Sequence, residues 1–354
     1  MSNPSGFCAT PTKLMTWRLM GFFKEGNVAK RRFVANCSRV KVLANIAFGR
    51  EVTRKVIDPI LPLNDIASGP AFYCVHGITG CATDFRFMAE MLGSSVKFYG
   101  IQNPTARRKA QFAASIEQIA RYYAERLNEF QPTGPLILGG HSVGAMIALE
   151  MAQQLRTLGR DIPLLIVLDG ELFNTGAEIS VFNPIYWIKL MLNSPRWVRD
   201  VLLAEFTFRS FLKALPRKIT AKAQSTVAGL AGKRADNAVE AMFDIRNFTP
   251  DHAEFVRALY KNQFKYIPKR YDGRVIVCVA KTQPLAYLLQ VETTWRKIAP
   301  AAEVVEFKAT HASLVLPADG LAVAEYLTGV LSEIIEEPIG RPQDHAYTGF
   351  RRAG

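Results

Sequence analysis

The 354-residue sequence lacks internal repeats, low-complexity blocks and any run of 18 uninterrupted apolar residues. A membrane-spanning helix needs about 20 apolar residues, so none is expected. The most apolar N-terminal segment, Leu14–Phe23, is broken by Arg18 and has no small-residue cleavage site, so it is not interpreted as a signal peptide. Hydrophobic residues make up 49% of the chain and charged residues 21%, which excludes disorder and predicts a globular protein.

Cysteine is also scarce. The five cysteines are odd in number and form no pair with metal-ligand spacing; they are Cys8, Cys37, Cys74, Cys81 and Cys278. A disulfide framework and a metal site are therefore not predicted, and neither is a bound cofactor. We expect a monomer in a reducing, cytoplasmic setting.

Acidic residues are fewer than basic ones, 31 against 44, which gives a net charge of +13. Residues 1–56 hold 11 Lys/Arg and 2 Asp/Glu, and residues 171–270 hold 16 and 9. Such a balance suits nucleic acid, an anionic membrane or an acidic protein partner. No nucleic-acid-binding motif is present, so that partner is not expected. For the apolar-basic segment Leu14–Arg32, packing on the chain's own core is favoured over membrane contact.

From Ala71 onward, short apolar segments alternate with helical ones. We expect strands at 71–75, 96–101, 135–139, 164–168, 274–280 and 303–308, and helices at 85–92, 115–130, 143–158, 285–298 and 321–335. This alternation predicts an α/β fold with a mostly parallel central sheet covered by helices on both faces. The helix 115–130 has the clearest signal, because Ser115 and Gln118 have capping-box spacing. Its expected buried face is Ile116, Ala120, Tyr123, Leu127 and Phe130.

Three parts follow from this pattern. Residues 1–57 are interpreted as a basic N-terminal extension, residues 58–340 as the α/β domain and residues 341–354 as a polar tail. Within the domain, residues 58–70 are interpreted as a proline-marked link. The alternation stops over residues 171–270, which we interpret as a large helical lid insertion at the end of one strand, called the insertion below.

The strongest chemical signal is Gly140-His141-Ser142-Val143-Gly144, which matches Gly-x-Ser-x-Gly. The motif directly follows the apolar strand and opens the next helix, the context of a nucleophile elbow. Ser142 would then stand at a helix N-terminus, where the dipole favours developing negative charge. Ser142 is therefore the predicted nucleophile.

A serine nucleophile needs a general base and an acid that orients this base. In α/β-hydrolases the chain order is serine, acid, histidine. Among the five histidines, only His311 follows a late strand, in the loop before the last helix, so it is the predicted base. Asp169 ends the strand next to the elbow and is the predicted acid, with Glu171 as the alternative.

Acyl transfer also needs backbone N–H donors that stabilise the oxyanion. We expect these to be Val143 N–H, directly after the nucleophile, and Ile78 N–H, in the loop that follows the first predicted strand. His76, which opens this loop, is interpreted as a structural residue.

Together these segments resemble the thioesterase domains that off-load fatty acid, polyketide and nonribosomal peptide synthases. The resemblance rests on Phe72–Gly77, Phe98–Gln102, Ser115–Ala120, Gly139–Ala145, Leu168-Asp169-Gly170, Tyr266–Val275 and His311, and covers about residues 70–335. It implies an α/β-hydrolase fold and supports Asp169 as the acid. It also implies an acyl-serine intermediate and release of the acyl group by water or an internal nucleophile, from a phosphopantetheine carrier or coenzyme A.

Two departures from the family's pattern bear on function. Many members have a proline after the histidine of the oxyanion loop, where this chain has Gly77-Ile78, a form also found in general α/β-hydrolases. A general carboxylesterase or lipase with the same triad is thus the alternative function. Residues 1–57 contain no Asp-Ser-Leu carrier signature, so the carrier would be met in trans. A third class, a binding protein without catalysis, is disfavoured by the complete triad.

The resemblance further implies an acidic carrier protein as partner. The net +7 charge of residues 171–270 suits such a partner. The densest basic run would place most of its charges on one side of a helix; it comprises Arg209, Lys213, Arg217, Lys218 and Lys222. A solvated basic face with no partner is the equal alternative.

Overall fold

The computed structural model describes residues 59–67, 69–93, 96–104, 114–176, 184–197, 248–283, 290–317 and 319–336. The predicted N-terminal extension, the C-terminal tail and the basic run of the insertion lie outside these residues. Within them, no helix is both long and apolar enough to cross a membrane.

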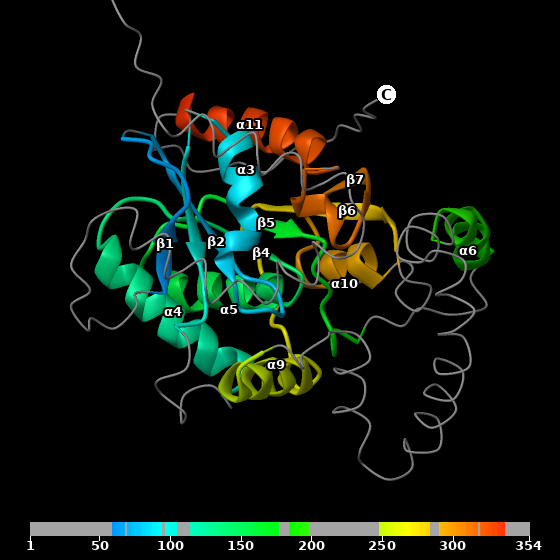
Figure 1. The fold of residues 1–354 in the computed structure, drawn as a ribbon, viewed down its shortest axis with the longest axis horizontal. Coiled ribbons are helices and arrows are strands. Elements are labelled where there is room, and N and C mark those ends of the chain that lie inside the picture. The colour runs from blue at the N-terminus through cyan, green and yellow to red at the C-terminus, as the bar shows by residue number, and fades with distance from the viewer. Residues whose placement is uncertain are drawn as a thin grey trace, which may run out of the picture.

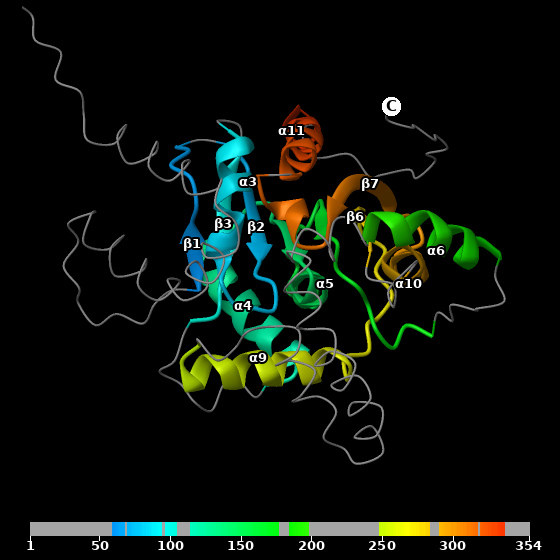
Figure 2. The ribbon, with the colours of Figure 1, turned by 45° about the vertical axis from the view of Figure 1, so that its right-hand side comes forward.

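A seven-stranded sheet forms the centre of the molecule, with strand order β1-β3-β2-β4-β5-β6-β7 (Figures 1 and 2). The strands are β1 (Ile60–Pro62), β2 (Ala71–Val75), β3 (Lys97–Ile101), β4 (Ile137–His141), β5 (Leu165–Leu168), β6 (Val275–Thr282) and β7 (Glu303–Thr310). All neighbouring pairs except β1–β3 are parallel. The predicted fold class is confirmed, and the six strands expected from the sequence all form.

Side chains that alternate along each strand build two separate cores. Tyr73 and Val75 of β2 point into one core, whereas Phe72 and Cys74 point into the other, and all four are buried. The first core is covered by α4 (Ile116–Phe130), α5 (Val143–Thr157) and α10 (Gln290–Ile298); the second is covered by α3 (Arg86–Met91) and α11 (Gly320–Glu336). Strands buried on both faces explain the continuous apolar runs in the sequence.

The first strand corrects the interpretation of residues 58–70 as a link. Ile60–Pro62 pairs antiparallel with β3, placing Ile60 opposite Ile101. The carbonyl of Pro59 also accepts a hydrogen bond from Gln102 N–H at 2.8 Å. Proline is tolerated at a sheet edge, and three residues are too few to show an alternating pattern, so this strand has no signal in the sequence.

The start of α4 confirms the predicted capping box. The Ser115 hydroxyl accepts from Gln118 N–H, and the Gln118 side chain accepts from Ser115 N–H at 3.0 Å. The expected buried face is correct up to Leu127. Phe130, at the last position, is 45% exposed and packs its ring against Tyr99, with 5.3 Å between ring centroids.

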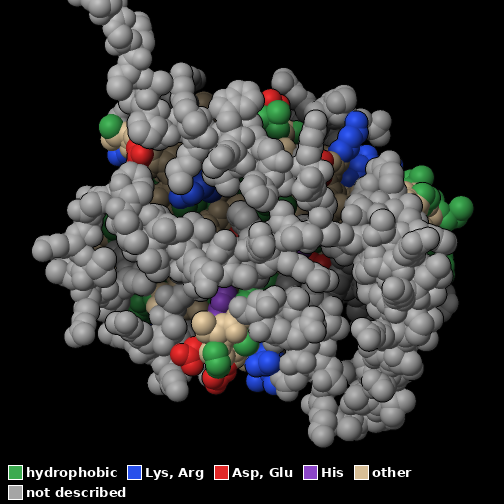
Figure 3. Space-filling view, viewed as in Figure 1, with side chains coloured by type: hydrophobic (Ala, Val, Ile, Leu, Met, Phe, Trp, Pro, Cys, Tyr) green, Lys and Arg blue, Asp and Glu red, His purple; other side chains and the backbone are tan. Residues whose placement is uncertain are grey.

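Two helices of the insertion are described, α6 (Pro184–Trp197) and α9 (Pro250–Gln263). In α9 the Thr249 hydroxyl caps the first turn by accepting from His252 N–H. Figure 3 shows acidic and basic side chains next to each other over this helix, which carries Asp251, Glu254, Arg257 and Lys261. The α9 surface is thus of mixed charge, and the predicted basic run lies elsewhere in the insertion.

Candidate active site

Ser142 lies in a sharp turn between β4 and α5. Its backbone angles are φ 57° and ψ −128°, a strained conformation for a residue with a side chain. Gly140 and Gly144 permit this turn because a Cβ on Gly140 would lie 2.2 Å from the Gly144 carbonyl oxygen, and one on Gly144 would lie 2.4 Å from the His76 oxygen. The turn therefore has the geometry of the predicted nucleophile elbow.

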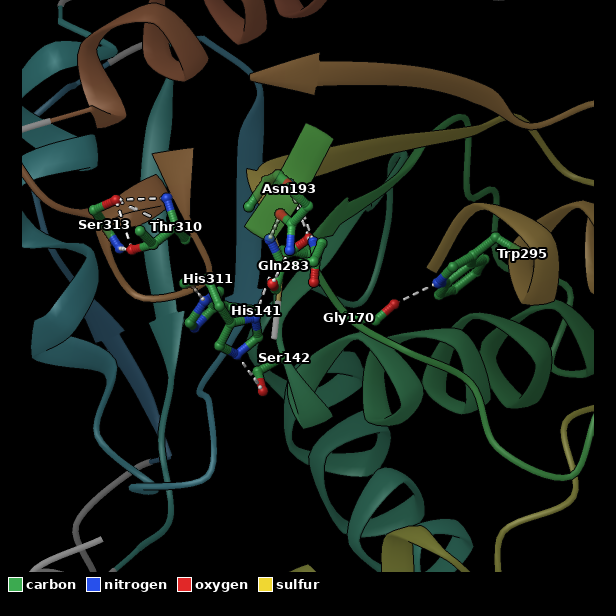
Figure 4. Close-up of polar contacts among 11 residues, drawn as sticks. His141, Ser142, Gly170, Asn193, Gln283, Trp295, Thr310, His311 and Ser313 are labelled. Atoms are coloured by element: carbon green, nitrogen blue, oxygen red, sulfur yellow. Dashed lines mark hydrogen bonds and ion pairs between the residues drawn. The ribbon is translucent and has the colours of Figure 1, made fainter. Parts of the chain in front are cut away.

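The structure brings Ser142, His311 and Asp169 into one chain of hydrogen bonds (Figure 4). His311 Nε2 lies 3.0 Å from Ser142 Oγ, and His311 Nδ1 lies 2.8 Å from Asp169 Oδ2. Because a carboxylate only accepts, Nδ1 carries the proton and Nε2 is free to accept the serine proton. The His311 side chain is 41% exposed and that of Asp169 is fully buried, so the imidazole alone of this pair is open to solvent.

Opposing effects act on the pKa of His311. Burial lowers this pKa, but the hydrogen bond and charge of Asp169 raise it above the ordinary value of 6.5. These contacts stabilise the imidazolium that forms when His311 accepts a proton, which is what a general base requires.

The two candidate acids differ in their surroundings. Asp169 directly follows β5, has a positive φ of 50° and contacts His311, as the sequence predicts. Burial raises the pKa of the alternative, Glu171, to about 8, with the Asp169 charge adding to the rise. Glu171 is therefore mostly protonated at neutral pH, and the geometry favours Asp169 as the charged partner.

Asp169 is held by donors that the sequence did not identify. Its Oδ1 accepts from Ala280 N–H at 2.9 Å and from Gln283 Nε2 at 2.7 Å. Ala280 lies in β6 and Gln283 directly follows this strand, which is next to β5 in the sheet. Gln283 could be located from the sequence only as a polar residue after a strand; its direction toward Asp169 depends on the tertiary fold.

The role of His141 was not predicted from the sequence. Only His311 was predicted as the base, because it follows a late strand, whereas His141 directly precedes the serine. Its ring stacks on that of His311, with 4.9 Å between centroids, and its Nε2–H donates to the His311 carbonyl at 3.0 Å. Burial, followed by the charge of His311, lowers the pKa of His141 to about 4. The ring therefore stays neutral at pH 7 and supports the backbone and ring of His311.

Hydrogen bonds also fix the turn that carries His311. Thr310 N–H donates to Ser313 Oγ at 2.8 Å, and Ser313 N–H donates to Thr310 Oγ1 at 3.1 Å (Figure 4). The Ser313 hydroxyl also contacts the carboxylate of Asp319. These two hydroxyl residues flank His311 and close a short turn between β7 and α11.

The loop predicted to supply an oxyanion donor lies against the elbow, as the close approach of Gly144 to the His76 carbonyl shows. Ile78 is in this loop and Val143 is the first residue of α5, so the structure brings both predicted donors to the nucleophile's end of the sheet. His76 is fully buried; its Nδ1 bonds the Gly77 carbonyl at 2.6 Å, and its Nε2 bonds the Tyr123 hydroxyl at 2.8 Å. This arrangement agrees with a structural role for His76.

Metal ligands do not gather anywhere in the described part of the chain, where no group of three or more His, Cys, Asp or Glu side chains could hold a metal ion. Cys74 and Cys278 are buried and carry free thiols, and Cys81 is also buried. Cys8 and Cys37 lie outside the described residues.

Comparison with known proteins places this site in a family context. The family model described as the thioesterase domain matches residues 70–176. Enterobactin synthase component F of Escherichia coli (strain K12) is 34% identical over 134 residues, covering 37% of this chain and 10% of that protein. A polyketide synthase of Bacillus subtilis (strain 168) is 34% identical over 111 residues, covering 31% of this chain and 4% of that protein.

The fold also matches part of a larger solved structure. A four-domain nonribosomal peptide synthetase bound to AMP and glycine is 18% identical with a TM-score of 0.54, covering 84% of this chain and 21% of that chain. At this identity the likeness concerns the fold alone. This chain spans a tenth or less of the length of the curated relatives described above.

Proposed function

We propose that the protein is a serine thioesterase, and support comes from the family model described as the thioesterase domain, which matches residues 70–176. The observation that carries the proposal is the hydrogen-bonded chain from Ser142 through His311 to Asp169. In the proposed reaction, a thioester of an acyl, polyketide or peptidyl group is transferred to the serine. The group is then released by water or by an internal nucleophile.

The first half-reaction begins at Ser142. Its Oγ attacks the thioester carbonyl while His311 Nε2 takes the hydroxyl proton, and the new imidazolium is stabilised by Asp169. The carbonyl oxygen becomes an oxyanion that the N–H groups of Ile78 and Val143 stabilise. When the C–S bond breaks, the imidazolium returns its proton to the departing thiolate, which leaves as a thiol, and the acyl group remains on Ser142.

The second half-reaction reverses the roles of the same groups. His311 takes a proton from water, or from a hydroxyl or amine of the acyl group itself. The activated oxygen or nitrogen then attacks the acyl-serine ester, and the proton passes to Ser142 Oγ as the ester bond breaks. Water gives a free acid, whereas an internal nucleophile gives a ring.

The substrate is proposed to arrive on the phosphopantetheine arm of a separate carrier protein or on coenzyme A. Support comes from the relatives described above, a component of enterobactin synthase and a polyketide synthase. The phosphopantetheine arm or coenzyme A arrives as part of the substrate. The proposed reaction uses no metal or cofactor of the protein itself, because the triad supplies the nucleophile and the proton transfers.

A substrate panel tests this function against a general esterase or lipase. The wild-type protein is given one acyl group as its carrier-protein thioester, its coenzyme A thioester and its p-nitrophenyl ester. We expect kcat/KM for a thioester to exceed that for the ester by about tenfold or more, equivalent to roughly 1.4 kcal/mol of transition-state binding. Turnover of the ester without turnover of either thioester would contradict the proposal.

A further inference from the structure

A buried amide connects the insertion to the end of β6. Asn193 of α6 is 3% exposed, although neighbouring apolar side chains on this helix are open: Trp187 is 53% and Met191 is 76% exposed. Figure 3 shows apolar side chains standing out over α6 at the right-hand edge of the molecule. Asn193 is thus a buried polar residue on a helix where four of the described apolar side chains, Trp187, Ile188, Met191 and Leu192, are exposed, the reverse of the usual pattern.

Asn193 uses both ends of its amide on one residue of the sheet. Its Oδ1 accepts from Gln283 N–H at 3.0 Å, and its Nδ2 donates to the Gln283 carbonyl at 2.8 Å. Gln283 is itself 7% exposed. Because both backbone groups are buried, loss of this pair would leave them unsatisfied, so the contact fixes the backbone of residue 283.

The side chain of the same glutamine reaches the triad. Its Nε2 donates to Asp169 Oδ1 at 2.7 Å and to the Ala280 carbonyl at 2.8 Å (Figure 4). The other oxygen of Asp169 is the one that binds His311. Asp169 is thus held between His311 and a glutamine whose backbone is bound by the insertion.

From these contacts we propose that α6 positions the triad acid through Asn193 and Gln283. When α6 is docked, Gln283 holds Asp169 in line with His311; when α6 moves away, the backbone of residue 283 relaxes and this restraint weakens. The insertion therefore controls the rate of the chemical step as well as covering the acyl group. A carrier protein or acyl chain that moved α6 would change the reactivity of Ser142. This inference rests on the proposed function, because it assigns a regulatory contact to the same triad.

Several readouts separate positioning of the acid from shaping of a binding site. The rate at which a small fluorophosphonate labels Ser142 reports on the triad alone, because the reagent is too small to need the insertion. The values of kcat and KM for a long-chain acyl-pantetheine thioester report on both. The variants are Asn193→Ala, Asn193→Asp and Gln283→Leu. Asn193→Asp keeps the side-chain size but replaces the donor with an oxygen that faces the Gln283 carbonyl.

A matched control lies one position along the helix. Ser194 donates to the Leu190 carbonyl within α6 at 2.6 Å, so Ser194→Ala changes the helix without touching Gln283. We expect Asn193→Ala and Asn193→Asp to slow labelling and lower kcat by about tenfold, the scale of one buried hydrogen bond that positions a charged group. Ser194→Ala should leave both values unchanged.

A double-mutant cycle tests whether the effect passes through the Gln283 side chain. Gln283→Leu keeps the backbone that Asn193 binds but removes the donor to Asp169. If the relay holds, adding Asn193→Ala to Gln283→Leu causes no further loss of labelling rate, so the two changes are non-additive. Fully additive losses would overturn the proposed relay.

Two further outcomes are decisive. A raised KM for the long-chain thioester with unchanged labelling in both Asn193 variants would mean that α6 only shapes the binding site, and would overturn the inference. Absence of labelling in the wild-type protein would instead contradict the serine mechanism itself, which keeps the two failures distinct.

Discussion

At the scale of single residues, two carboxyl groups near His311 have different surroundings. Asp169 is buried and accepts hydrogen bonds from Ala280, Gln283 and His311, so both of its oxygens have partners. Burial of Glu171 raises its pKa to about 8. Two acidic residues separated by a single glycine in the sequence thus have different surroundings, and only Asp169 has a hydrogen bond to His311 among the contacts described above.

The substitution Asp169→Asn tests the role of the acid. The neutral amide cannot stabilise the imidazolium. Its NH2 group can also donate to Nδ1, which moves the ring proton to Nε2, so the ring can no longer accept the serine proton. We therefore expect kcat to fall by about 10³-fold or more. Steady-state kinetics with an acyl-pantetheine thioester measure the loss.

The neighbouring substitution Glu171→Gln is the matched control for this prediction. It makes the same carboxyl-to-amide change in a group that is already mostly protonated, so kcat should stay within about threefold of the wild-type value. A large loss in Glu171→Gln together with near-normal turnover in Asp169→Asn would exchange the two assignments.

The pH dependence of kcat/KM follows from the raised pKa of His311. The base is active when neutral, so activity rises with pH through this pKa, and the midpoint should lie above 6.5. In Asp169→Asn the charge that raises the pKa is removed and burial dominates, so the remaining activity should have its midpoint at lower pH. A wild-type midpoint below 6.5, or one that rises in the variant, would disagree with this account.

How far the sequence predicted the site depends on what each residue needs. Ser142, Asp169 and His311 carry local signals, since each follows an apolar strand, and the structure brings all three together. Gln283 also follows a strand, but nothing local directs it toward Asp169, and His141 precedes the serine without any signal of its role. Their roles require knowing that β6 lies beside β5 and that the elbow faces the β7–α11 turn, which are tertiary facts.

At the scale of secondary-structure elements, α10 anchors the end of β5. The indole N–H of Trp295 donates to the Gly170 carbonyl at 2.6 Å, and this side chain is fully buried (Figure 4). Gly170 follows Asp169 directly, so the helix fixes the backbone beside the acid. A large aromatic residue thus supplies both packing and one polar contact.

Trp295→Phe should therefore affect both stability and activity. The variant keeps much of the packing but leaves the Gly170 carbonyl without its donor, so we expect a loss of about 1–3 kcal/mol in the free energy of unfolding. We also expect a several-fold lower kcat because the backbone beside Asp169 becomes less restrained. Chemical denaturation and steady-state kinetics measure the two effects.

Trp17→Phe, with the same change of side chain at a position outside the described residues, serves as a comparison for the general cost of this substitution. If Trp295→Phe lowered stability no more than Trp17→Phe and left kcat unchanged, the hydrogen bond to Gly170 would have no measurable role.

The sequence predicted most elements because their patterns are local. Strands buried on both faces appear as apolar runs, and the Ser115–Gln118 capping box marks the start of α4. The short edge strand β1 was missed because its pairing with β3 comes from tertiary contact. The burial of Phe130 was wrongly expected: at the last position of α4 its ring packs against Tyr99 but is still 45% exposed.

At the scale of the whole molecule, the uneven charge suits either an acidic protein partner or a solvated basic face, and these two explanations can be tested against each other. The basic run of the insertion lies outside the described residues, and the described helix α9 carries both signs of charge. The prediction therefore concerns the run alone, with Arg209, Lys213 and Lys218 as its test positions. Exposed charges act mainly on association and are screened beyond about 8 Å at physiological salt.

Reversing these three charges to glutamate should raise KM for an acyl-carrier substrate, most clearly at low salt. The same variant should turn over a small acyl-pantetheine thioester normally, because that substrate lacks the protein partner. Reversal of three basic residues in the N-terminal extension, Lys30, Arg31 and Arg32, makes the same change in net charge elsewhere and should have little effect. Equal responses of both substrates, or of both variants, would exclude the run as a carrier-docking surface.

The central claim is that Ser142 is the nucleophile. Its most direct test is mass spectrometry of peptides from wild-type and Ser142→Ala protein after reaction with a fluorophosphonate. We predict one added phosphonyl group on the wild-type peptide that contains Ser142, and none on the corresponding peptide or elsewhere in the variant. Labelling of the variant at the wild-type rate would place the nucleophile on another residue and contradict the account.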